Sequence, residues 1–260
     1  MNIQSVRHLS SPVAETRPTR NILGVDVAPL SWSEAIDVLE RRMRERRFTK
    51  VGFLNAHAAN SASADPAYAA AMQDFMVLPD GVGVDMASRM LYGANFPANL
   101  NGTDLVPAFL KALATPVRVG LLGTSRRNVE VAAENLRAML PQHEIIVVSD
   151  GFFSDREESG ILERLRQLRP DVLLVAMGVP RQELWMDRNL TDQHCTLAFA
   201  VGALLDFMSG AVPRAPTWIR RSRLEWLFRL ILEPSRLWRR YMIGNPVFLI
   251  RIVRQLLLGR

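Results

Sequence analysis

Asp80 lies in a Pro-Asp-Gly turn that directly follows a short apolar run, residues 75–78. A carboxylate on such a turn is well placed to take a proton from a bound hydroxyl group. It could instead cap the helix predicted from Val82, a use that Asp serves very often. Asn55 and His57 follow another apolar run, and His57 could be a base, a ligand or a hydrogen-bonded structural residue. The residues alone leave both alternatives open.

Two glycine-containing strings precede predicted helices and could hold a phosphate group. Asn101 to Asp104 reads Asn-Gly-Thr-Asp, and Gly123 lies in a Leu-Gly-Thr-Ser string after an apolar run. A helix N-terminus offers free N–H groups and a positive dipole end, which suit a nucleotide phosphate. Ordinary turns and caps need the same residues, so a structural role is equally well supported. The chain has no G-x-G-x-x-G and no Walker string, which disfavours a Rossmann dehydrogenase or a P-loop enzyme.

The most distinctive string, residues 176–185, reads Ala-Met-Gly-Val-Pro-Arg-Gln-Glu-Leu-Trp. It combines the end of an apolar run, a Gly-x-Pro turn and the beginning of a helix. A later run ends in the same way at a Gly-Ala-Leu-Leu-Asp string. Glu183 could be only a dipole partner in a first helical turn, and Asp206 either a nucleotide contact or a solvated helix residue. The candidates in these two strings are Gly178, Pro180, Gln182, Glu183, Gly202 and Asp206.

Possible metal ligands are sparse in this sequence. No histidine has another histidine four residues away, no Asp-x-Asp string occurs, and Cys195 is the only cysteine. We therefore expect no metal site, no cofactor and no disulfide framework. The charge of a leaving diphosphate would then have to be met by arginine, whose guanidinium is planar, permanently charged and bidentate.

Basic and aromatic residues are concentrated at the end of the chain. Residues 218–260 hold ten arginines and two glutamates, whereas the whole chain of 260 residues has a net charge of only +6. Tryptophan, tyrosine and phenylalanine are interleaved with these arginines. No stretch of this tail reaches the roughly 18 to 20 uncharged residues of a spanning helix. The composition is typical of a segment that lies on an anionic membrane surface.

Short apolar runs alternate with segments of helical periodicity before the tail. Helices are expected to begin after Ser31, Thr103 and Ser125, which would be their N-caps. The alternation predicts an α/β fold, with a Rossmann-like, mostly parallel sheet that has helices on both faces and binds ligands beyond the carboxyl ends of its strands. The predicted strands are residues 51–54, 75–78, 117–122, 145–148, 172–177 and 197–201.

Composition divides the chain into three parts. We interpret residues 1–20 as a flexible leader, because they lack the apolar run of a signal peptide. Residues 21–213 form the predicted α/β core, and residues 214–260 form a basic, amphipathic, helical tail that associates with membranes. The boundary falls at the prolines of residues 213–216.

Taken together, these strings resemble the WecG/TagA/CpsF family of bacterial glycosyltransferases, glycosyltransferase family 26. Members transfer a sugar from a UDP-sugar to an undecaprenyl-diphosphate-linked sugar on the cytoplasmic membrane face. Their products include teichoic acid linkage units, enterobacterial common antigen, capsule and exopolysaccharide. The strings that carry the resemblance, in the family's order, are residues 55–57, 78–83, 101–104, 175–185, 201–206, 214–218, and 224–229 with 233–236.

The resemblance implies roles for individual residues. Asp80 matches the family's catalytic base, and Gln182 matches a glutamine that is needed for activity. Three arginines of the family's C-terminal appendage, which meet the diphosphate, match Arg229, Arg236 and Arg239. The residues expected to bind substrate are Asn55, His57, Asn101, Asp104, Gly123, Gly178, Pro180, Glu183, Gly202 and Asp206.

The donor sugar is left open by one departure from the family pattern. Some members carry Thr two positions before the first asparagine of the motifs, where this sequence has Phe53. The donor could be UDP-N-acetylmannosamine, UDP-glucose, UDP-N-acetylglucosamine or a UDP-linked uronic acid.

The implied reaction is a single displacement with inversion, in which Asp80 draws the proton from the acceptor hydroxyl and arginines stabilise the leaving UDP. We expect a lipid-linked sugar acceptor, a membrane surface bound by the tail, no nucleic acid, a homo-oligomer, and a cytoplasmic, peripheral membrane location. Two alternatives remain. One is a nucleotide-binding regulatory protein, and the other is a nucleic-acid-binding protein that uses its arginine and aromatic side chains.

Overall fold

A computed structural model describes residues 18–216, 218–219 and 224–259. Most of the expected leader, residues 1–17, lies outside this part of the chain, and Arg20 already belongs to a strand. The described residues form one sheet in the order β1-β2-β4-β3-β8-β7-β5-β6, in which β1 and β2 pair antiparallel and the other neighbours are parallel. The strands are β1 (Arg20–Ile22), β2 (Val25–Val27), β3 (Thr49–Leu54), β4 (Phe75–Pro79), β5 (Arg118–Gly123), β6 (Glu144–Ser149), β7 (Val172–Ala176) and β8 (Leu197–Ala200).

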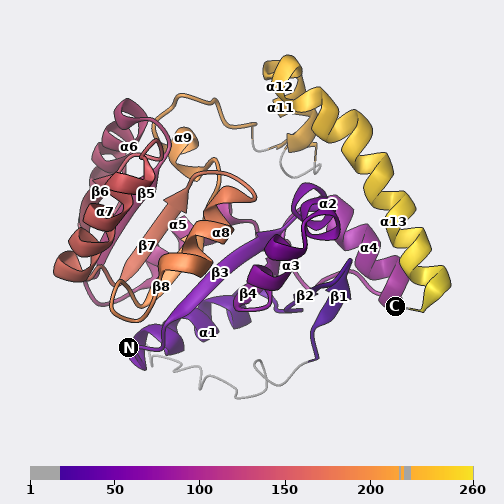
Figure 1. Cartoon of the computed structure of the whole chain (residues 1–260), viewed down its shortest axis with the longest axis horizontal. Coiled ribbons are helices and arrows are strands. Elements are labelled where there is room, and N and C mark those ends of the chain that lie inside the picture. The colour runs from indigo at the N-terminus through magenta and orange to yellow at the C-terminus, as the bar shows by residue number, and fades with distance from the viewer. Residues whose placement is uncertain (1–17, 217, 220–223, 260) are drawn as a thin grey trace, which may run out of the picture.

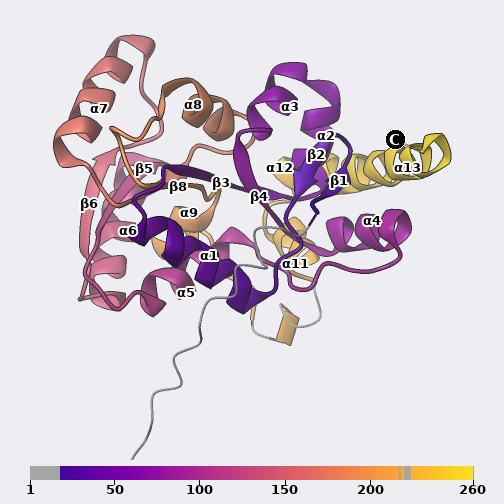
Figure 2. The same ribbon diagram turned by 90° about the horizontal axis from the view of Figure 1, so that it is seen from below.

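Helices cover both faces of this sheet, which confirms the predicted fold class. Figure 2 shows α3, α7 and α8 on one face and α1, α5 and α6 on the other. Each layer buries its own apolar cluster against the sheet. The helices of the core are α1 (Trp32–Arg44), α2 (Ala56–Ala64), α3 (Pro66–Met72), α4 (Val82–Tyr92), α5 (Gly102–Ala112), α6 (Arg126–Met139), α7 (Asp155–Leu168), α8 (Arg181–Asn189) and α9 (Leu204–Met208).

All six strands predicted from apolar runs are present, with bounds shifted by a residue or two. The hairpin of β1 and β2 was not predicted, because strands of three residues are too short to show a periodicity. The caps Ser31 and Ser125 are confirmed by hydrogen bonds from Glu34 and Asn128 N–H.

The expected cap of α5 was wrong. Asn101 is the N-cap, because its Oδ1 accepts the Asp104 N–H at 2.9 Å. Thr103 lies inside the helix and donates its own hydroxyl to the same Oδ1 at 2.6 Å. These two hydrogen bonds hold the Asn101 side chain in one orientation at the beginning of α5.

The tail folds back over the core as a run of helices. It comprises α11 (Glu225–Leu232), α12 (Pro234–Trp238), the π-helix η2 (Arg239–Ile243) and α13 (Gly244–Leu258). Figure 1 shows α13 lying along α2 and α4 at the edge of the molecule. Phe248 and Ile252 are buried in this contact, and Arg251 donates to the backbone and side-chain oxygens of Asn60 at 2.9 Å. The end of the chain is therefore docked on the core by both apolar and polar contacts.

The expectation that no part of the tail could span a membrane needs correction. In the described part of the chain, the helical run Pro234–Leu258 has the length and composition of a membrane-crossing helix. One side of that run is held by the core, as the burial of Phe248 and Ile252 shows. Its other side exposes apolar residues, among them Ile250 and Leu257, which are 68% and 79% exposed. A one-sided apolar surface of this kind is what a helix lying in a membrane interface presents.

Gly123, at the end of β5, lies in close contact with the backbone of β7, and a substitution there tests this contact. Its φ is +135°, and an added Cβ would lie 2.3 Å from the carbonyl oxygen of Ala176 on β7. Gly123→Ala is expected to lower the free energy of unfolding by about 3 kcal/mol or more, because backbone atoms cannot give way there. Denaturant unfolding measures this change.

Gly160→Ala is the matched control for that experiment. Gly160 is an exposed residue of α7, and an added Cβ would meet nothing within 4 Å. This variant is expected to gain about 0.5–1 kcal/mol from helix propensity. A Gly123→Ala protein as stable as the parent would contradict the close approach of β5 and β7.

Candidate active site

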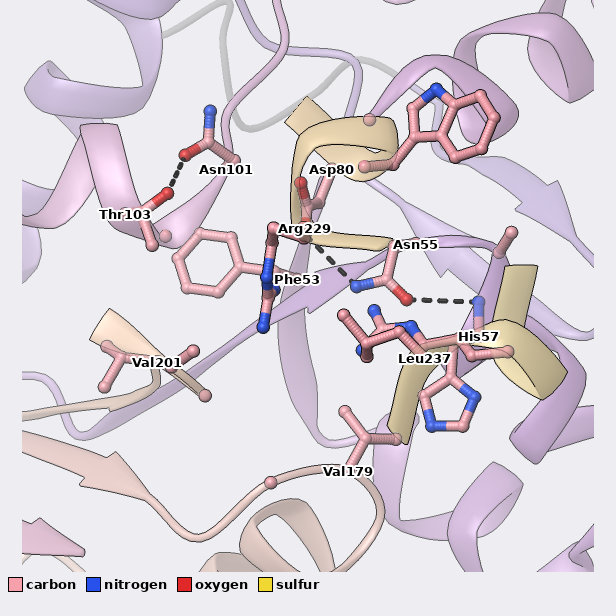
Figure 3. Close-up of a pocket in the computed structure, with 18 of the residues that line it drawn as sticks. Phe53, Asn55, His57, Asp80, Asn101, Thr103, Val179, Val201, Arg229 and Leu237 are labelled. Atoms are coloured by element: carbon pink, nitrogen blue, oxygen red, sulfur yellow. Dashed lines mark hydrogen bonds between the residues drawn. The ribbon is translucent and has the colours of Figure 1, made fainter. Parts of the chain in front are cut away.

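The carboxyl ends of β3, β4, β5, β7 and β8 open into one large pocket of about 980 Å³. The tail lines its other side through residues of α11, α12, η2 and α13. Figure 3 shows side chains from the strand ends and from the tail pointing into this shared space. Parallel sheets place their ligand sites at this edge, so the pocket lies where the sequence predicted it.

Asn55 and Asp80 form the floor of the pocket, and the register of the sheet brings them together. Leu54 pairs with Pro79, so the next residue of each strand lies beside the other. Asn55 Oδ1 accepts the N–H groups of His57 and Ala58 at 3.1 Å and caps α2. Its amide nitrogen must then face the other way, and it donates to Asp80 Oδ2 at 3.2 Å (Figure 3). The helix cap thus orients the donor that holds the carboxylate.

Asp80 does not cap α4. The N-cap of that helix is Gly81, with φ of 93° and no side-chain cap bond, so the alternative of a capping aspartate is wrong. The carboxylate is left to face the pocket. Burial raises the pKa of Asp80, while the Asn55 hydrogen bond and the guanidinium groups of Arg240 and Arg229 oppose that rise. A carboxylate with a raised pKa is a better proton acceptor than an exposed one.

His57 lines the pocket beside this pair but carries no charge at neutral pH. Burial, and next the guanidinium of Arg240, lower the pKa of His57 to about 4. A neutral imidazole can donate one hydrogen bond and accept another. His57 can therefore bind a polar group without adding charge to the pocket.

A second polar group lies at the ends of β5 and β8. Asp206 accepts hydrogen bonds from the Thr124 hydroxyl and from Asn128, the latter at 3.1 Å. All three side chains line the pocket. Asp206 is thus part of a fixed polar cluster, which excludes the interpretation of a merely solvated helix residue. Gly123, beside this cluster, is needed for the close approach of β5 and β7 and does not itself line the pocket.

Gln182 connects two of the loops that border the pocket. Its Oε1 accepts the N–H of Gly178 and the N–H of Gly202, each at 3.1 Å, and its Nε2 donates to Glu183 Oε1 at 2.8 Å. The side chain is buried, with 2% exposed. Gln182 therefore fixes the β7–α8 and β8–α9 turns relative to each other. Pro180 is the N-cap of α8 at the same turn.

Glu183 lies behind the pocket and not in it. It is 1% exposed, and its Oε1 accepts a hydrogen bond from Gln182 Nε2. Asp104 also lies outside the pocket lining, where it accepts from Asn101 at 3.0 Å and from Arg214 at 2.5 Å. The candidate residues that do line the pocket are Asn55, His57, Asp80, Asn101, Gly178, Gln182, Gly202, Asp206, Arg229 and Arg236.

The tail brings arginines over the floor of the pocket. Arg229 is mostly buried, lies 5.4 Å from the Phe207 ring, and shares Glu233 with Arg236. Arg239, the third arginine of the motif, is exposed, lies 5.4 Å from the Trp238 ring and does not line the pocket. The neighbouring Arg240 lines it instead.

Phe53 supplies an apolar part of the floor. Its ring lies so close to α5 that a Cβ at Gly102 would meet it at 2.8 Å. The side chain is 7% exposed and presents part of its ring to the pocket. Its aromatic surface suits the apolar face of a sugar ring, whereas a hydroxyl side chain would offer a hydrogen bond there.

Within the described residues, no group of three or more histidine, cysteine, aspartate or glutamate side chains is arranged to hold a metal ion. The positive charge that the described pocket lining presents comes from arginines, including Arg229, Arg236 and Arg240. Guanidinium groups recognise phosphate oxygens in a bidentate manner.

Comparison with known proteins decides the family. A model of the "Glycosyl transferase WecG/TagA/CpsF family" matches residues 20–260. The chain belongs to this family of glycosyltransferases. A relative from Bacillus spizizenii is 33% identical over 73% of this chain and 73% of its own length. Relatives from Bacillus subtilis and Staphylococcus aureus are 28% and 27% identical and match 91% and 90% of this chain, and each covers 92% of its own length.

These relatives carry the same name, N-acetylglucosaminyldiphosphoundecaprenol N-acetyl-beta-D-mannosaminyltransferase. They therefore act on a sugar linked to a polyprenyl diphosphate. The family expected from the sequence is thus confirmed over the whole described core and tail.

Sequence reasoning missed several residues of the pocket. Thr124, although part of the Leu-Gly-Thr-Ser string, and Asn128, in the first turn of α6, were not chosen as candidates, and both donate to Asp206. Asn99, which accepts the Gly81 N–H at 2.8 Å, gave no signal, because its partner lies across a loop. Arg240 could have been found, since it lies four residues after Arg236 and thus on the same side of a helix.

Glu183 predicts an unusual dependence of stability on pH. Burial raises its pKa from 4.5 to about 7. Because the folded pKa lies above the unfolded value, the stability that the protonated form contributes is complete below pH 4.5 and is lost as pH rises through 7. A glutamine cannot ionise, so Glu183→Gln should not show this loss. Above pH 7 its free energy of unfolding should exceed that of the parent by an amount on the order of a few kcal/mol.

Unfolding curves recorded across this pH range compare the two proteins. Glu163→Gln, a change at an exposed residue of α7, should keep the parent's pH profile. Parallel profiles for the parent and Glu183→Gln would show that Glu183 does not titrate in this range.

Proposed function

We propose that this chain transfers a sugar from a UDP-sugar to the sugar of a polyprenyl-diphosphate-linked acceptor, with inversion at the anomeric carbon and without a metal ion. The observation that carries the proposal is the position of Asp80, held by Asn55 on the floor of a pocket whose other side presents arginines. A base and a set of phosphate-binding cations on facing walls are what such a displacement needs. The family and the names of the relatives support the acceptor class.

In this mechanism Asp80 takes the proton of the acceptor hydroxyl. The hydroxyl oxygen forms a bond to the anomeric carbon as the bond from that carbon to the diphosphate oxygen breaks, and UDP leaves with the electron pair. Inversion follows because attack and departure lie on opposite faces of the sugar. The Asn55 donor holds the carboxylate in position for the transfer.

Arg229 and Arg236 meet the negative charge that develops on UDP. Both line the pocket from the tail, and Arg229 is 15% exposed, so its charge is poorly screened by water. The Thr124, Asn128 and Asp206 cluster offers donors and an acceptor for the nucleoside. Gln182 acts as a positioning residue, because it holds the turns at Gly178 and Gly202 in place.

The donor sugar belongs to the N-acetylmannosamine, glucose, N-acetylglucosamine or uronic acid class. The relatives' names favour N-acetylmannosamine. Phe53 favours a donor or acceptor that presents an apolar ring face to the floor.

The product serves cell-surface or exopolysaccharide biosynthesis at the cytoplasmic face of the membrane. The exposed apolar side of α13 and the basic composition of the tail support a peripheral attachment there. We divide the chain into a core, residues 21–213, and a tail, residues 214–260, because the tail is the part that would contact the membrane while it also lines the pocket. A homo-oligomer remains a prediction.

Asp80→Asn tests the base. The amide keeps the shape of the side chain but cannot accept a proton, so transfer should fall by about 10²–10⁴-fold with little change in the thermal midpoint. Asp192→Asn, at an exposed site that precedes β8 and lies at the opposite edge of the sheet, should leave turnover unchanged. The measurement is product formation from a UDP-sugar and a polyprenyl-diphosphate sugar. Turnover near that of the parent in Asp80→Asn would remove this residue from the mechanism.

The double variant Ile250→Asn and Leu257→Asn tests membrane attachment. These residues are exposed on the side of α13 away from the core, so folding should be unaffected. Binding to vesicles of acidic lipid, measured by sedimentation, should weaken about tenfold or more because two apolar side chains no longer enter the interface. Met139→Asn, at a half-exposed apolar residue of α6, is the control. Equal vesicle binding by the parent and the double variant would contradict attachment through this surface.

A further inference from the structure

Gln182 holds two turns of the pocket through the oxygen of its carboxamide. That Oε1 accepts the N–H of Gly178, which follows β7, and the N–H of Gly202, which follows β8, each at 3.1 Å. Both glycines have a positive φ, 82° and 54°, and glycine adopts a negative φ about as readily. The two turns therefore depend on an outside contact to keep one shape, and both glycines line the pocket.

The hydrogen bonds of Gln182 are possible in only one orientation of its carboxamide. A carboxamide has an accepting oxygen at one end and a donating nitrogen at the other. Rotation by half a turn would place the Nε2 hydrogens against the N–H groups of Gly178 and Gly202, which are donors as well. An acceptor beside Nε2 therefore decides whether Gln182 holds the two turns.

Glu183 supplies this acceptor from the next position of α8. Its Oε1 accepts from Gln182 Nε2 at 2.8 Å, and the two side chains are 1% and 2% exposed. A rotated Gln182 would direct its oxygen at a carboxyl oxygen, and an ionised carboxylate has no proton to donate in return. Glu183 thus selects the orientation of Gln182, although it does not line the pocket itself.

The carboxyl group of Glu183 does not serve stability at this place. Its Oε2 is buried and has no hydrogen-bond partner among the described residues. The helix α8 packs against α3, where the hydroxyl of Tyr68 is likewise buried and lacks a partner in the part of the chain that the structure describes. A buried polar atom without a partner lowers stability, and an apolar side chain of similar size would avoid that cost. A role other than stability therefore accounts better for the carboxyl group.

The turns that Gln182 holds lead directly to other parts of the pocket. Gly202 lies four residues before Asp206, which accepts hydrogen bonds from Thr124 and Asn128. Gly178 precedes Val179, another residue of the pocket lining. A change in the orientation of Gln182 would therefore move two walls of the pocket together.

We propose that Glu183 is a positioning residue of the active site, which accepts the Gln182 amide and thereby fixes the turns at Gly178 and Gly202 in the shape that sugar transfer needs. The inference rests on the proposed function for the reaction that is measured. The effect on the two turns stands on its own, since it follows from the hydrogen bonds of Gln182.

Glu183→Leu and Glu183→Gln separate the accepting oxygen from the bulk of the side chain. Leucine removes the acceptor, so kcat/KM for sugar transfer should fall by about 10- to 100-fold, as expected when the groups of a site are slightly misplaced. The thermal midpoint of Glu183→Leu at pH 8 should not fall in parallel, because the variant also loses a buried ionisable group. Glutamine still offers an oxygen to Gln182 Nε2, so Glu183→Gln should keep kcat/KM within about threefold of the parent.

Tyr68→Phe is the matched control for these variants. It removes the other partnerless polar atom of the layer between α3 and α8 and leaves Glu183 and Gln182 in place. This variant should have a thermal midpoint at or above that of the parent and transfer sugar at the same rate. Equal losses of kcat/KM in Tyr68→Phe and Glu183→Leu would show that packing in this layer, and not the Glu183 oxygen, is what matters, and would overturn the proposal.

Hydrogen exchange of the Gly178 and Gly202 N–H groups, followed by NMR, measures the positioning without any substrate. Both groups should exchange slowly in the parent and in Glu183→Gln, and about tenfold faster or more in Glu183→Leu, because Gln182 no longer holds them. Unchanged exchange or unchanged kcat/KM in Glu183→Leu overturns the proposal. The same holds if the activity of Glu183→Leu falls only as far as its folded fraction, since that result indicates a purely structural role.

The exchange measurement also distinguishes this proposal from the proposed function. If exchange at Gly178 and Gly202 changes as expected while the parent transfers no sugar from any UDP-sugar, the proposed function fails and the control of the two turns by Glu183 stands.

Discussion

The carboxylate of Asp80 and the guanidinium groups of the tail act on each other across the pocket. Asp80 directly follows β4, while Arg229 and Arg240 come from helices about 150 and 160 residues later in the sequence. Burial alone would favour the protonated acid, and the facing guanidinium groups favour its ionised form. The charged surroundings of Asp80 are therefore complete only when the tail is docked. The contacts that dock it, at Phe248 and Arg251, belong to the site as much as the pocket lining does.

The sheet makes this arrangement possible because its register puts polar residues side by side. Pairing of Leu54 with Pro79 places Asn55 against Asp80, and the cap of α2 turns the Asn55 amide toward the carboxylate. Gln182 does the equivalent work between the turns that follow β7 and β8. In both places the side-chain oxygen of a carboxamide accepts backbone N–H groups, while its nitrogen donates to a carboxylate. The same hydrogen bonds that form a helix cap or a turn therefore also orient a side chain at or near the pocket.

The sequence predicted the fold well, because buried parallel strands are short apolar runs. It also put candidate residues such as Asn55 and Asp80 at the ends of those strands, where the pocket lies. Sequence patterns were not enough where the role of a residue depends on its three-dimensional contacts. They could not distinguish Asp80 as a cap from Asp80 as a base, and they assigned the cap of α5 to Thr103 instead of Asn101. Motif landmarks selected Arg239, whereas helical spacing and the docking of Tyr241 bring Arg240 to the pocket. The placement of Glu183 behind the site required coordinates, since sequence carries no sign of burial for a glutamate in a first helical turn.

The central claim is the transfer of a sugar between a UDP-sugar and a polyprenyl-diphosphate sugar. The most direct measurement incubates the purified chain with a panel of UDP-sugars and synthetic polyprenyl-diphosphate sugars in acidic-lipid vesicles, with EDTA present. The account predicts product from one donor, with inverted anomeric configuration, and UDP released in equal amount. No product from any donor, together with no effect of UDP on the thermal midpoint, would contradict it.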